Sequence, residues 1–259
     1  MSTSELMVDR QGPVLRLTLN RPARRNALSP ALIDQLHRAF VDASADHALR
    51  AIVLTGAGDA AFCAGADLDP QAGTFGFNPA EPTTAYANLL RVARAVRVPM
   101  IARINGACMA GGMGLLAVCD LAVAASSARF ALPEVRVGLF PMQVAALLQT
   151  LLPPRIFAEM CLTGEALSAE QALACGLLNR VATPTELDAQ TDALVARVVA
   201  QSPSAIRRGK HALTASAGMT FEQAIAHMEA QAGLMLLTED AREGMAAFAE
   251  KRAAVWTGR

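Results

Sequence analysis

The sequence lacks an excess of charge of either sign. Its 259 residues include 23 Lys and Arg and 23 Asp and Glu, so the formal net charge at pH 7 is zero. A balanced chain has no basic surface of the kind that attracts nucleic acid or an anionic membrane, so we expect neither as a partner. Charged residues make up only 18% and apolar residues 53%, a proportion that excludes intrinsic disorder.

The sequence also lacks long hydrophobic runs and clustered metal ligands. No stretch reaches the roughly 18 uninterrupted apolar residues of a membrane-spanning helix, and residues 1–10 contain no apolar core of a secretion signal. The 5 cysteines form no CxxC motif, and the 4 histidines are scattered singly along the chain. We therefore expect no metal site, no disulfide and a location in the reducing cytoplasm.

Alternating strand and helix patterns predict an α/β fold. The strand patterns lie at residues 13–20, 51–55, 100–104, 120–125 and 129–132. Helix patterns begin at the Ser29-Pro30 pair and cover residues 83–96, and a loop is expected over residues 57–80. A glycine-rich turn at residues 105–114 is expected to lead into a further helix.

The strand signal fades after residue 168, and helix patterns take over. A capping box formed by Ser168 and Gln171 predicts the start of one helix. Longer helices are expected at about 185–200, 203–217 and 220–255, the last broken near Thr238. We therefore divide the chain into a core at residues 1–195 and a helical oligomerisation region at residues 196–259.

Two segments of small residues follow buried strands, at residues 62–68 and 105–114. The carboxyl ends of strands are where open α/β sheets place ligands, and small side chains let a ligand reach main-chain N–H groups. Neither segment matches GxxxxGK[ST] or GxGxxG, so neither is a phosphate loop. Close packing of helix against strand is the alternative explanation. Glu134 follows the strand at 129–132 and is a candidate acid or base, or otherwise a solvated loop glutamate.

An ordered series of motifs along nearly the whole chain resembles the crotonase superfamily, which includes enoyl-CoA hydratases and isomerases. The motifs are Leu19-Asn20-Arg21-Pro22, Asn26-Ala27-Leu28, residues 62–68, Ile104-Asn105-Gly106, Gly111-Gly112, Cys119-Asp120, Pro133-Glu134, residues 138–141, Thr163-Gly164, residues 172–176, residues 178–181 and residues 243–252.

The resemblance implies a spiral of ββα units followed by a C-terminal helical region that builds homotrimers, or hexamers as dimers of trimers. It implies an acyl-CoA thioester as ligand, with coenzyme A entering as part of the substrate and no separate cofactor. The composition supports assembly independently, because apolar residues at 220–237 exceed the single stripe that a surface helix needs.

The resemblance also assigns roles to individual residues. It implies that the main-chain N–H groups of Ala66 and Gly111 form an oxyanion hole, and that Glu134 is the catalytic carboxylate. The positions that match the coenzyme A contacts of the family are Arg24, Arg25, Ala27, Ala64, Ala66, Asp67, Leu68, Phe248 and Lys251. Phe248 and Lys251 would approach a coenzyme A bound to a neighbouring subunit.

One departure from the family pattern concerns the reaction. Typical hydratases carry a second glutamate, and Gly114 occupies its position here. Glu134 would then perform both proton transfers of a hydration, or share them with a substrate group or a bound water. We favour hydration of a 2-enoyl-CoA through an enolate. The alternatives are a Δ3–Δ2-enoyl-CoA isomerase that uses Glu134 alone, and a non-catalytic thioester-binding protein, against which the retained Glu134 argues.

Overall fold

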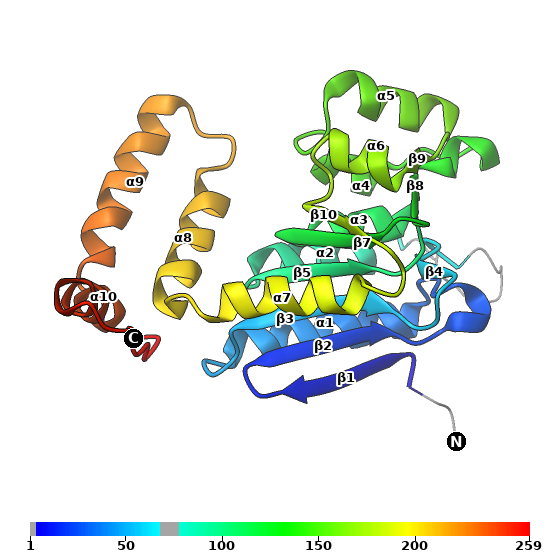
Figure 1. Ribbon diagram of the computed structural model, residues 1–259. Helices are drawn as coiled ribbons and strands as arrows, with labels where there is room; N and C mark the ends of the chain where they lie inside the picture. Colours follow the sequence, from blue (N-terminus) through cyan, green and yellow to red (C-terminus); the bar gives the residue numbers. More distant parts are fainter. Residues whose placement is uncertain (1–3, 68–77) are drawn as a thin grey trace.

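The computed structural model describes residues 4–67 and 78–259, and its centre is a six-stranded sheet (Figure 1). The first two strands are antiparallel, and the remaining pairs are parallel. The order across the sheet is β1 (Leu6–Gln11), β2 (Val14–Leu19), β3 (Ala51–Gly56), β5 (Met100–Ile104), β7 (Leu121–Ala125) and β10 (Arg180–Ala182).

A second, four-stranded sheet lies beside the first. Its order is β4 (Ala61–Cys63), β6 (Ala107–Met109), β8 (Arg129–Ala131) and β9 (Leu167–Ser168). After each of β3, β5 and β7, the chain turns within a few residues into the next strand of the small sheet. This winding confirms the α/β class and the spiral of ββα units.

Several strands were missing from the sequence prediction. β4 lies inside the segment expected to be a loop, and β6 lies inside the expected glycine-rich turn. Both span only three residues, so neither is long enough to produce an alternating pattern of polar and apolar residues.

Most helices begin where the sequence predicts. Ser29 Oγ accepts a hydrogen bond from Leu32 N at 3.1 Å, and Ser168 and Gln171 form the expected capping box. The predicted helices are α1 (Pro30–Ala45), α2 (Ala85–Ala95), α3 (Gly111–Ala117), α6 (Ala169–Ala174), α7 (Leu187–Val199), α8 (Pro203–Ser216), α9 (Phe221–Met235) and α10 (Glu239–Glu250). The structure adds η1 (Pro22–Arg24), η3 (Pro133–Val137), α4 (Met142–Leu148) and α5 (Pro154–Thr163).

The six-stranded sheet is covered on both faces. In the fully buried β3, Ile52 and Leu54 belong to one apolar cluster, and Ala51 and Val53 belong to another with Val195 of α7. Alternate residues of a strand point to opposite faces, which explains the two clusters. Helix α7 runs through residue 195 and packs on this face of the sheet.

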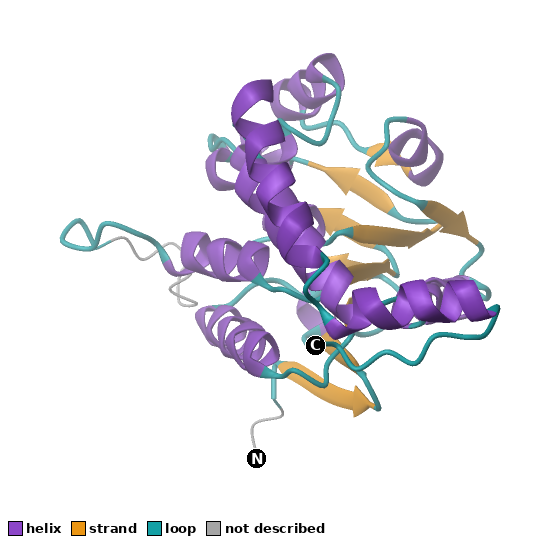
Figure 2. Cartoon of the chain, turned by 90° about the vertical axis from the view of Figure 1, so that its left-hand side faces the viewer, coloured by secondary structure: helices purple, strands orange, loops and turns teal. Residues whose placement is uncertain are grey.

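Helices α8, α9 and α10 and the C-terminus form a unit that we call the C-terminal arm, residues 203–259. Helix α9 packs beside α8, and the two helices project from the body (Figure 1). Figure 2 views the chain from the side of these helices. None of the residues of α9 is buried. Across the described residues, no helix has the length and apolar character needed to cross a membrane.

Candidate active site

Two loops that are distant in sequence are joined by hydrogen bonds at one end of the sheets. Asn26 Nδ2 donates to the carbonyl oxygens of Ala57 at 3.0 Å and Ala61 at 2.8 Å. Ala64 N donates to the Arg25 carbonyl at 3.0 Å. The structure thus brings together six of the residues expected to hold coenzyme A: Arg24, Arg25, Ala27, Ala64, Ala66 and Asp67. Leu68 lies outside the described residues.

The buried side chain of Asp67 links these loops through ion pairs. Its side chain pairs with Arg21 Nη2 at 2.9 Å and with Arg24 Nη2 at 3.3 Å. The Asp67 side chain is 6% exposed, whereas that of Arg24 is 51% exposed. The carboxylate therefore positions Arg21 and Arg24, and Arg24 keeps half of its surface open to a ligand.

The Ala66 N–H group is directed away from its neighbouring strand segment. Ala66 forms a parallel bridge with Leu28, in which Leu28 N donates to Gly65 O at 2.7 Å and Asp67 N donates to Leu28 O at 3.0 Å. In parallel pairing these two bonds use the residues on either side of Ala66, so its own N–H points to the opposite side.

The Gly111 N–H group lies next to this segment. Gly111 is the first residue of α3, where N–H groups have no partner within the helix. Gly65 has a φ of +94°, and a Cβ atom there would lie 3.2 Å from Gly111 N and 2.6 Å from Ala110 Cβ. Only glycine fits this close approach, which brings the Ala66 and Gly111 segments together.

Glu134 is the third element of the site. It lies in η3, directly after β8, and Ala110 N, beside Gly111, donates to the β8 carbonyl of Ala131 at 3.0 Å. Glu134 is half-buried, and its Oε2 has no hydrogen-bond partner among the described residues. Burial raises the pKa of this carboxyl above its usual range. A buried carboxylate with a raised pKa is suited to transfer protons near neutral pH.

The sequence interpretation missed Tyr86, the single tyrosine of the chain. Tyr86 lies on α2, and its hydroxyl donates to the Gly111 carbonyl at 2.5 Å. A Cβ atom on Gly114 would lie 2.1 Å from the same hydroxyl oxygen. Burial, and then the neighbouring Cys63, Cys108 and Glu134, raise the pKa of Tyr86 well above its usual range. The space at the missing second glutamate is therefore occupied by a neutral phenol.

Two of the expected coenzyme A residues lie away from this site. Phe248 is on α10 and Lys251 ends that helix, so both belong to the C-terminal arm (Figure 1). Phe248 is 87% exposed, and Lys251 is exposed as well. Among residues 4–67 and 78–259, no group of three or more His, Cys, Asp or Glu side chains is arranged to hold a metal ion.

Comparison with known proteins places the chain in a family. The model of the enoyl-CoA hydratase/isomerase family matches residues 9–259. The chain belongs to this family. It is 36% identical over 268 residues to a protein named carnitinyl-CoA dehydratase from Salmonella typhi, covering 99% of this chain and 100% of the relative. The chain is therefore an enzyme that acts on acyl-CoA thioesters.

Solved structures of similar chains agree with this assignment. An enoyl-CoA hydratase from Mycobacterium smegmatis superposes with a TM-score of 0.90 at 36% identity, over 97% of this chain and 98% of that chain. An enoyl-CoA hydratase from Bacillus anthracis gives a TM-score of 0.91 at 29% identity, over 98% of this chain and 100% of that chain. The family enzyme described here thus has the crotonase fold.

Proposed function

We propose that this family member hydrates the 2,3 double bond of a 2-enoyl-CoA, and dehydrates the corresponding 3-hydroxyacyl-CoA, with Glu134 as acid and base. The observation that carries the proposal is the buried Glu134 Oε2, which has no protein partner among the described residues. A structural glutamate at this depth would be paired, because an unpaired buried carboxylate is destabilising. A catalytic carboxylate keeps its free oxygen for the reacting proton.

The chemical steps need one carboxylate and two N–H donors. The Glu134 carboxylate takes a proton from water as the water oxygen bonds to C3, and the electron pair of the double bond moves to the thioester as an enolate. The N–H groups of Ala66 and Gly111 stabilise the enolate oxygen, and one such donor contributes about 3–4 kcal/mol in comparable enzymes. The protonated Glu134 then gives its proton to C2.

The names of similar proteins support hydration over the alternatives. Hydratase and dehydratase name the same reaction in opposite directions, and similar chains carry both names. Isomerisation is the second candidate, because moving one proton from C2 to C4 requires only one carboxylate and Gly114 supplies none. Non-catalytic binding is the weakest candidate, since a binder has no use for the unpaired Glu134.

The substrate also supplies the only cofactor that the proposal requires. Coenzyme A enters as the thioester carrier, and no metal takes part. Arg24 and Arg25 are exposed beside the joined loops, where their charges favour the phosphates of coenzyme A. Ala27, Ala64 and Asp67 would shape the main-chain surface along which the pantetheine arm lies.

An absorbance experiment tests the reaction. Wild-type enzyme is incubated with crotonyl-CoA and, separately, with a 3-enoyl-CoA, and the ultraviolet absorbance of the conjugated thioester is followed. Loss of conjugation from crotonyl-CoA supports hydration. Gain of conjugation from the 3-enoyl-CoA, with crotonyl-CoA unchanged, would instead identify an isomerase. No change with either thioester would favour the non-catalytic alternative.

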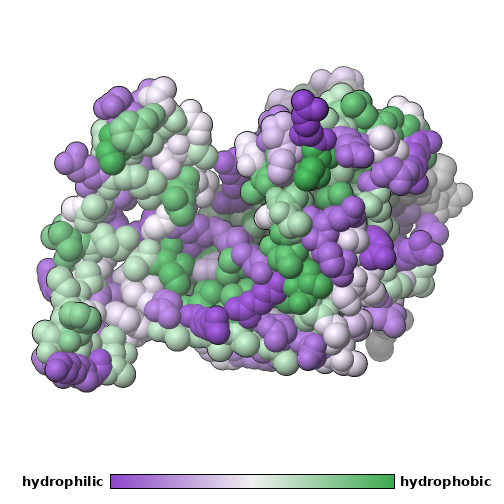
Figure 3. Space-filling model, turned by 45° about the horizontal axis from the view of Figure 1, so that its top comes forward, coloured by the Kyte–Doolittle hydropathy of each residue, from purple (hydrophilic) through white to green (hydrophobic). Residues whose placement is uncertain are grey.

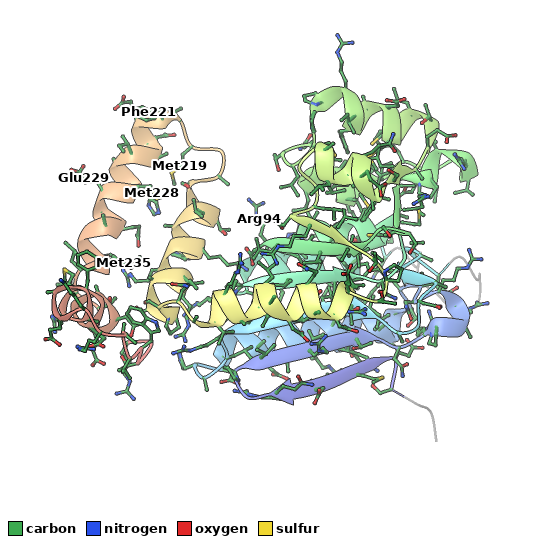
Figure 4. All side chains as sticks on the ribbon, viewed as in Figure 1. Arg94, Met219, Phe221, Met228, Glu229 and Met235 are labelled. Carbon is green, nitrogen blue, oxygen red and sulfur yellow. The ribbon has the colours of Figure 1, made fainter. Side chains whose placement is uncertain are left out.

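We further propose that the cytoplasmic enzyme is a homotrimer, or a hexamer built as a dimer of trimers, with Phe248 and Lys251 near the coenzyme A of a neighbour. Phe221, Met228 and Met235 lie along α9 (Figure 4). Phe221 is 75% exposed in the isolated chain. Figure 3 shows hydrophobic residues on the arm and on the body beside it. Contiguous apolar surface of this kind is normally buried by a partner.

A further inference from the structure

The hydroxyl of Tyr86 ends where the side chain of a glutamate at residue 114 would begin. The nearest heavy atoms to a Cβ at Gly114 are the Tyr86 hydroxyl oxygen at 2.1 Å, the Tyr86 Cζ at 3.3 Å and Leu90 Cδ2 at 3.4 Å. A glutamate would extend three further bonds from that Cβ to its carboxylate oxygens. The Tyr86 hydroxyl oxygen therefore lies where the side chain of that glutamate would leave the backbone, and it is the polar atom at this position.

The hydrogen bond of Tyr86 determines what that atom can do. The phenol has one proton, which it donates to the Gly111 carbonyl at 2.5 Å. Its oxygen lone pairs remain as hydrogen-bond acceptors. Because the pKa of Tyr86 is raised well above its usual range by burial, the phenol stays protonated and does not compete with Glu134 as a base. Tyr86 can therefore accept a hydrogen bond from a ligand O–H group without removing its proton.

We propose that Tyr86 is a specificity-determining residue that accepts a hydrogen bond from the 3-hydroxyl group of a bound 3-hydroxyacyl-CoA, or from the water that becomes this hydroxyl. The inference rests on the function proposed above, in which the thioester oxygen is bound by the N–H groups of Ala66 and Gly111. Glu134 moves both protons in this arrangement. Tyr86 holds the oxygen atom that adds to C3, a task for which a second carboxylate is not required.

Binding measurements separate this role from a purely structural one. Glu134→Gln is used as the background to prevent turnover, and Tyr86→Phe is added to it. Calorimetry then gives Kd values for 3-hydroxybutyryl-CoA and for butyryl-CoA, which lacks the hydroxyl. We expect Tyr86→Phe to weaken 3-hydroxybutyryl-CoA binding about fivefold to tenfold, the usual effect of one hydrogen bond, and to change butyryl-CoA binding less than about twofold.

A second variant keeps the tyrosine at residue 86 but moves its hydroxyl group away from its present position. Gly114→Ala places a methyl group on the position of the Tyr86 hydroxyl, so it should produce the same selective loss in the Glu134→Gln background. This variant also keeps the test decisive if Tyr86→Phe does not fold. Equal weakening of both thioesters would overturn the proposal, because it would show that Tyr86 acts only through the Gly111 peptide. Unchanged binding of both would overturn it as well.

The same measurements distinguish failure of this proposal from failure of the proposed function. If the wild-type enzyme does not hydrate crotonyl-CoA but the selective loss is observed, the hydratase assignment is wrong and the role of Tyr86 in recognising the 3-hydroxyl stands. If the wild-type enzyme hydrates crotonyl-CoA but Tyr86→Phe causes no selective loss of binding, the hydratase assignment stands and the proposed role of Tyr86 is wrong. If neither thioester binds to the Glu134→Gln protein or to the wild type, both proposals are wrong.

Discussion

Gly65 packs against Gly111 so closely that a Cβ atom on residue 65 would lie 3.2 Å from the Gly111 backbone nitrogen. This contact connects the turn that carries the Ala66 N–H group to the start of α3, which carries the Gly111 N–H group. The relative position of the two donors is thus set by main-chain packing. It does not depend on the side chain of Ala66.

Gly65→Ala should therefore lower activity, because the added Cβ atom would move the Ala66 and Gly111 N–H groups apart. Gly176→Ala is the matched control, because Gly176 also has a positive φ, +83°, but has no atoms within 4 Å of the added Cβ. We expect the control to lose about 1 kcal/mol of stability and retain full activity. Gly65→Ala should lose about 2–4 kcal/mol and lower kcat about 10²–10³-fold. Equal kcat values in the two folded variants would contradict the proposed oxyanion hole.

Glu134→Gln should lower turnover on the true substrate about 10²–10⁴-fold, the usual contribution of a general acid or base. Glu165→Gln is the control, because Glu165 is 74% exposed and pairs with Arg136 at the surface. It should keep wild-type turnover. Retention of wild-type turnover in Glu134→Gln would exclude the assignment of Glu134.

Glu134→Gln should also be at least as stable as the wild type at neutral pH. The pKa of Glu134 is raised in the folded protein by burial, so the folded chain holds this proton to higher pH than the unfolded chain. Wild-type stability therefore falls as pH rises from about 4.5 through the folded-state pKa. Glu134→Gln does not lose stability in this way. The difference in unfolding free energy between the variant and the wild type should therefore grow from about pH 4.5 to the folded-state pKa of Glu134 and stay constant above it. Thermal melts at several pH values measure it.

A double-mutant cycle tests the contact between Tyr86 and Gly114. In the wild type, Gly114→Ala places its methyl group on the Tyr86 hydroxyl and should lower stability by about 1–3 kcal/mol. In a Tyr86→Phe background the hydroxyl is absent, and the next nearest atom is 3.3 Å away, so the same substitution should have a smaller effect. Strict additivity of the two free-energy changes would mean that the residues do not interact.

The packing within the C-terminal arm should weaken in acid through Asp240, whose partners lie in the arm and at Ser202 directly before it. This buried residue accepts hydrogen bonds from Ser202 Oγ at 2.8 Å and Gly258 N at 3.0 Å. Burial alone would raise the pKa of Asp240, but its hydrogen bonds lower it to about 2. The carboxylate thus contributes about 2 kcal/mol above pH 4, and the contribution is lost as pH falls toward 2.

Asp240→Asn should remove this acid sensitivity and lower stability at neutral pH. Asp188→Asn is a suitable control, because Asp188 is 67% exposed and its pair with Arg103 lies at the surface. Urea unfolding at pH 7 and pH 3 measures both effects. Identical pH profiles for Asp240→Asn and the wild type would contradict the role assigned to Asp240.

The exposed apolar residues of the C-terminal arm lead us to expect that the protein assembles into oligomers in solution. A homotrimer of the 27.1 kDa chain would have a mass of about 80 kDa, and a hexamer twice that mass. Light scattering at micromolar concentration measures it. Phe221→Asp, which places a charge on the exposed face of α9, should reduce the mass. A stable monomer that still turns over acyl-CoA would contradict the proposed assembly.

The fold was predictable from the sequence wherever a pattern is long or a cap is explicit. The strand at 100–104 and the capping box at Ser168 were placed correctly for this reason. Helices α4 and α5 were missed because Pro141 and Pro153 precede them, and neither provides a side-chain hydrogen bond at the helix start. Of the three-residue strands in the small sheet, β8 was predicted at 129–132, whereas β4 and β6 were missed because backbone pairing within loop-like sequence defines them.

The site was predictable only where a motif stands in continuous sequence. Ala66 and Gly111 lie in the small-residue segments that follow predicted strands, Glu134 follows a predicted strand directly, and the structure brings the Ala66 and Gly111 segments into contact. Tyr86 was missed because it lies on a different helix, 25 residues before the carbonyl to which it donates. Its contact with Gly114 depends on how α2 packs beside α3, and no local pattern encodes that arrangement.

The donors of the proposed oxyanion hole, the N–H groups of Ala66 and Gly111, belong to the main chain. Only replacement by proline deletes a backbone N–H, so most mutations at these positions leave the donors in place. Side chains around them, such as those at positions 86 and 114, can therefore diverge during evolution without loss of the donors. A scaffold of this kind can acquire a new reaction through one or two substitutions and still stabilise the same enolate.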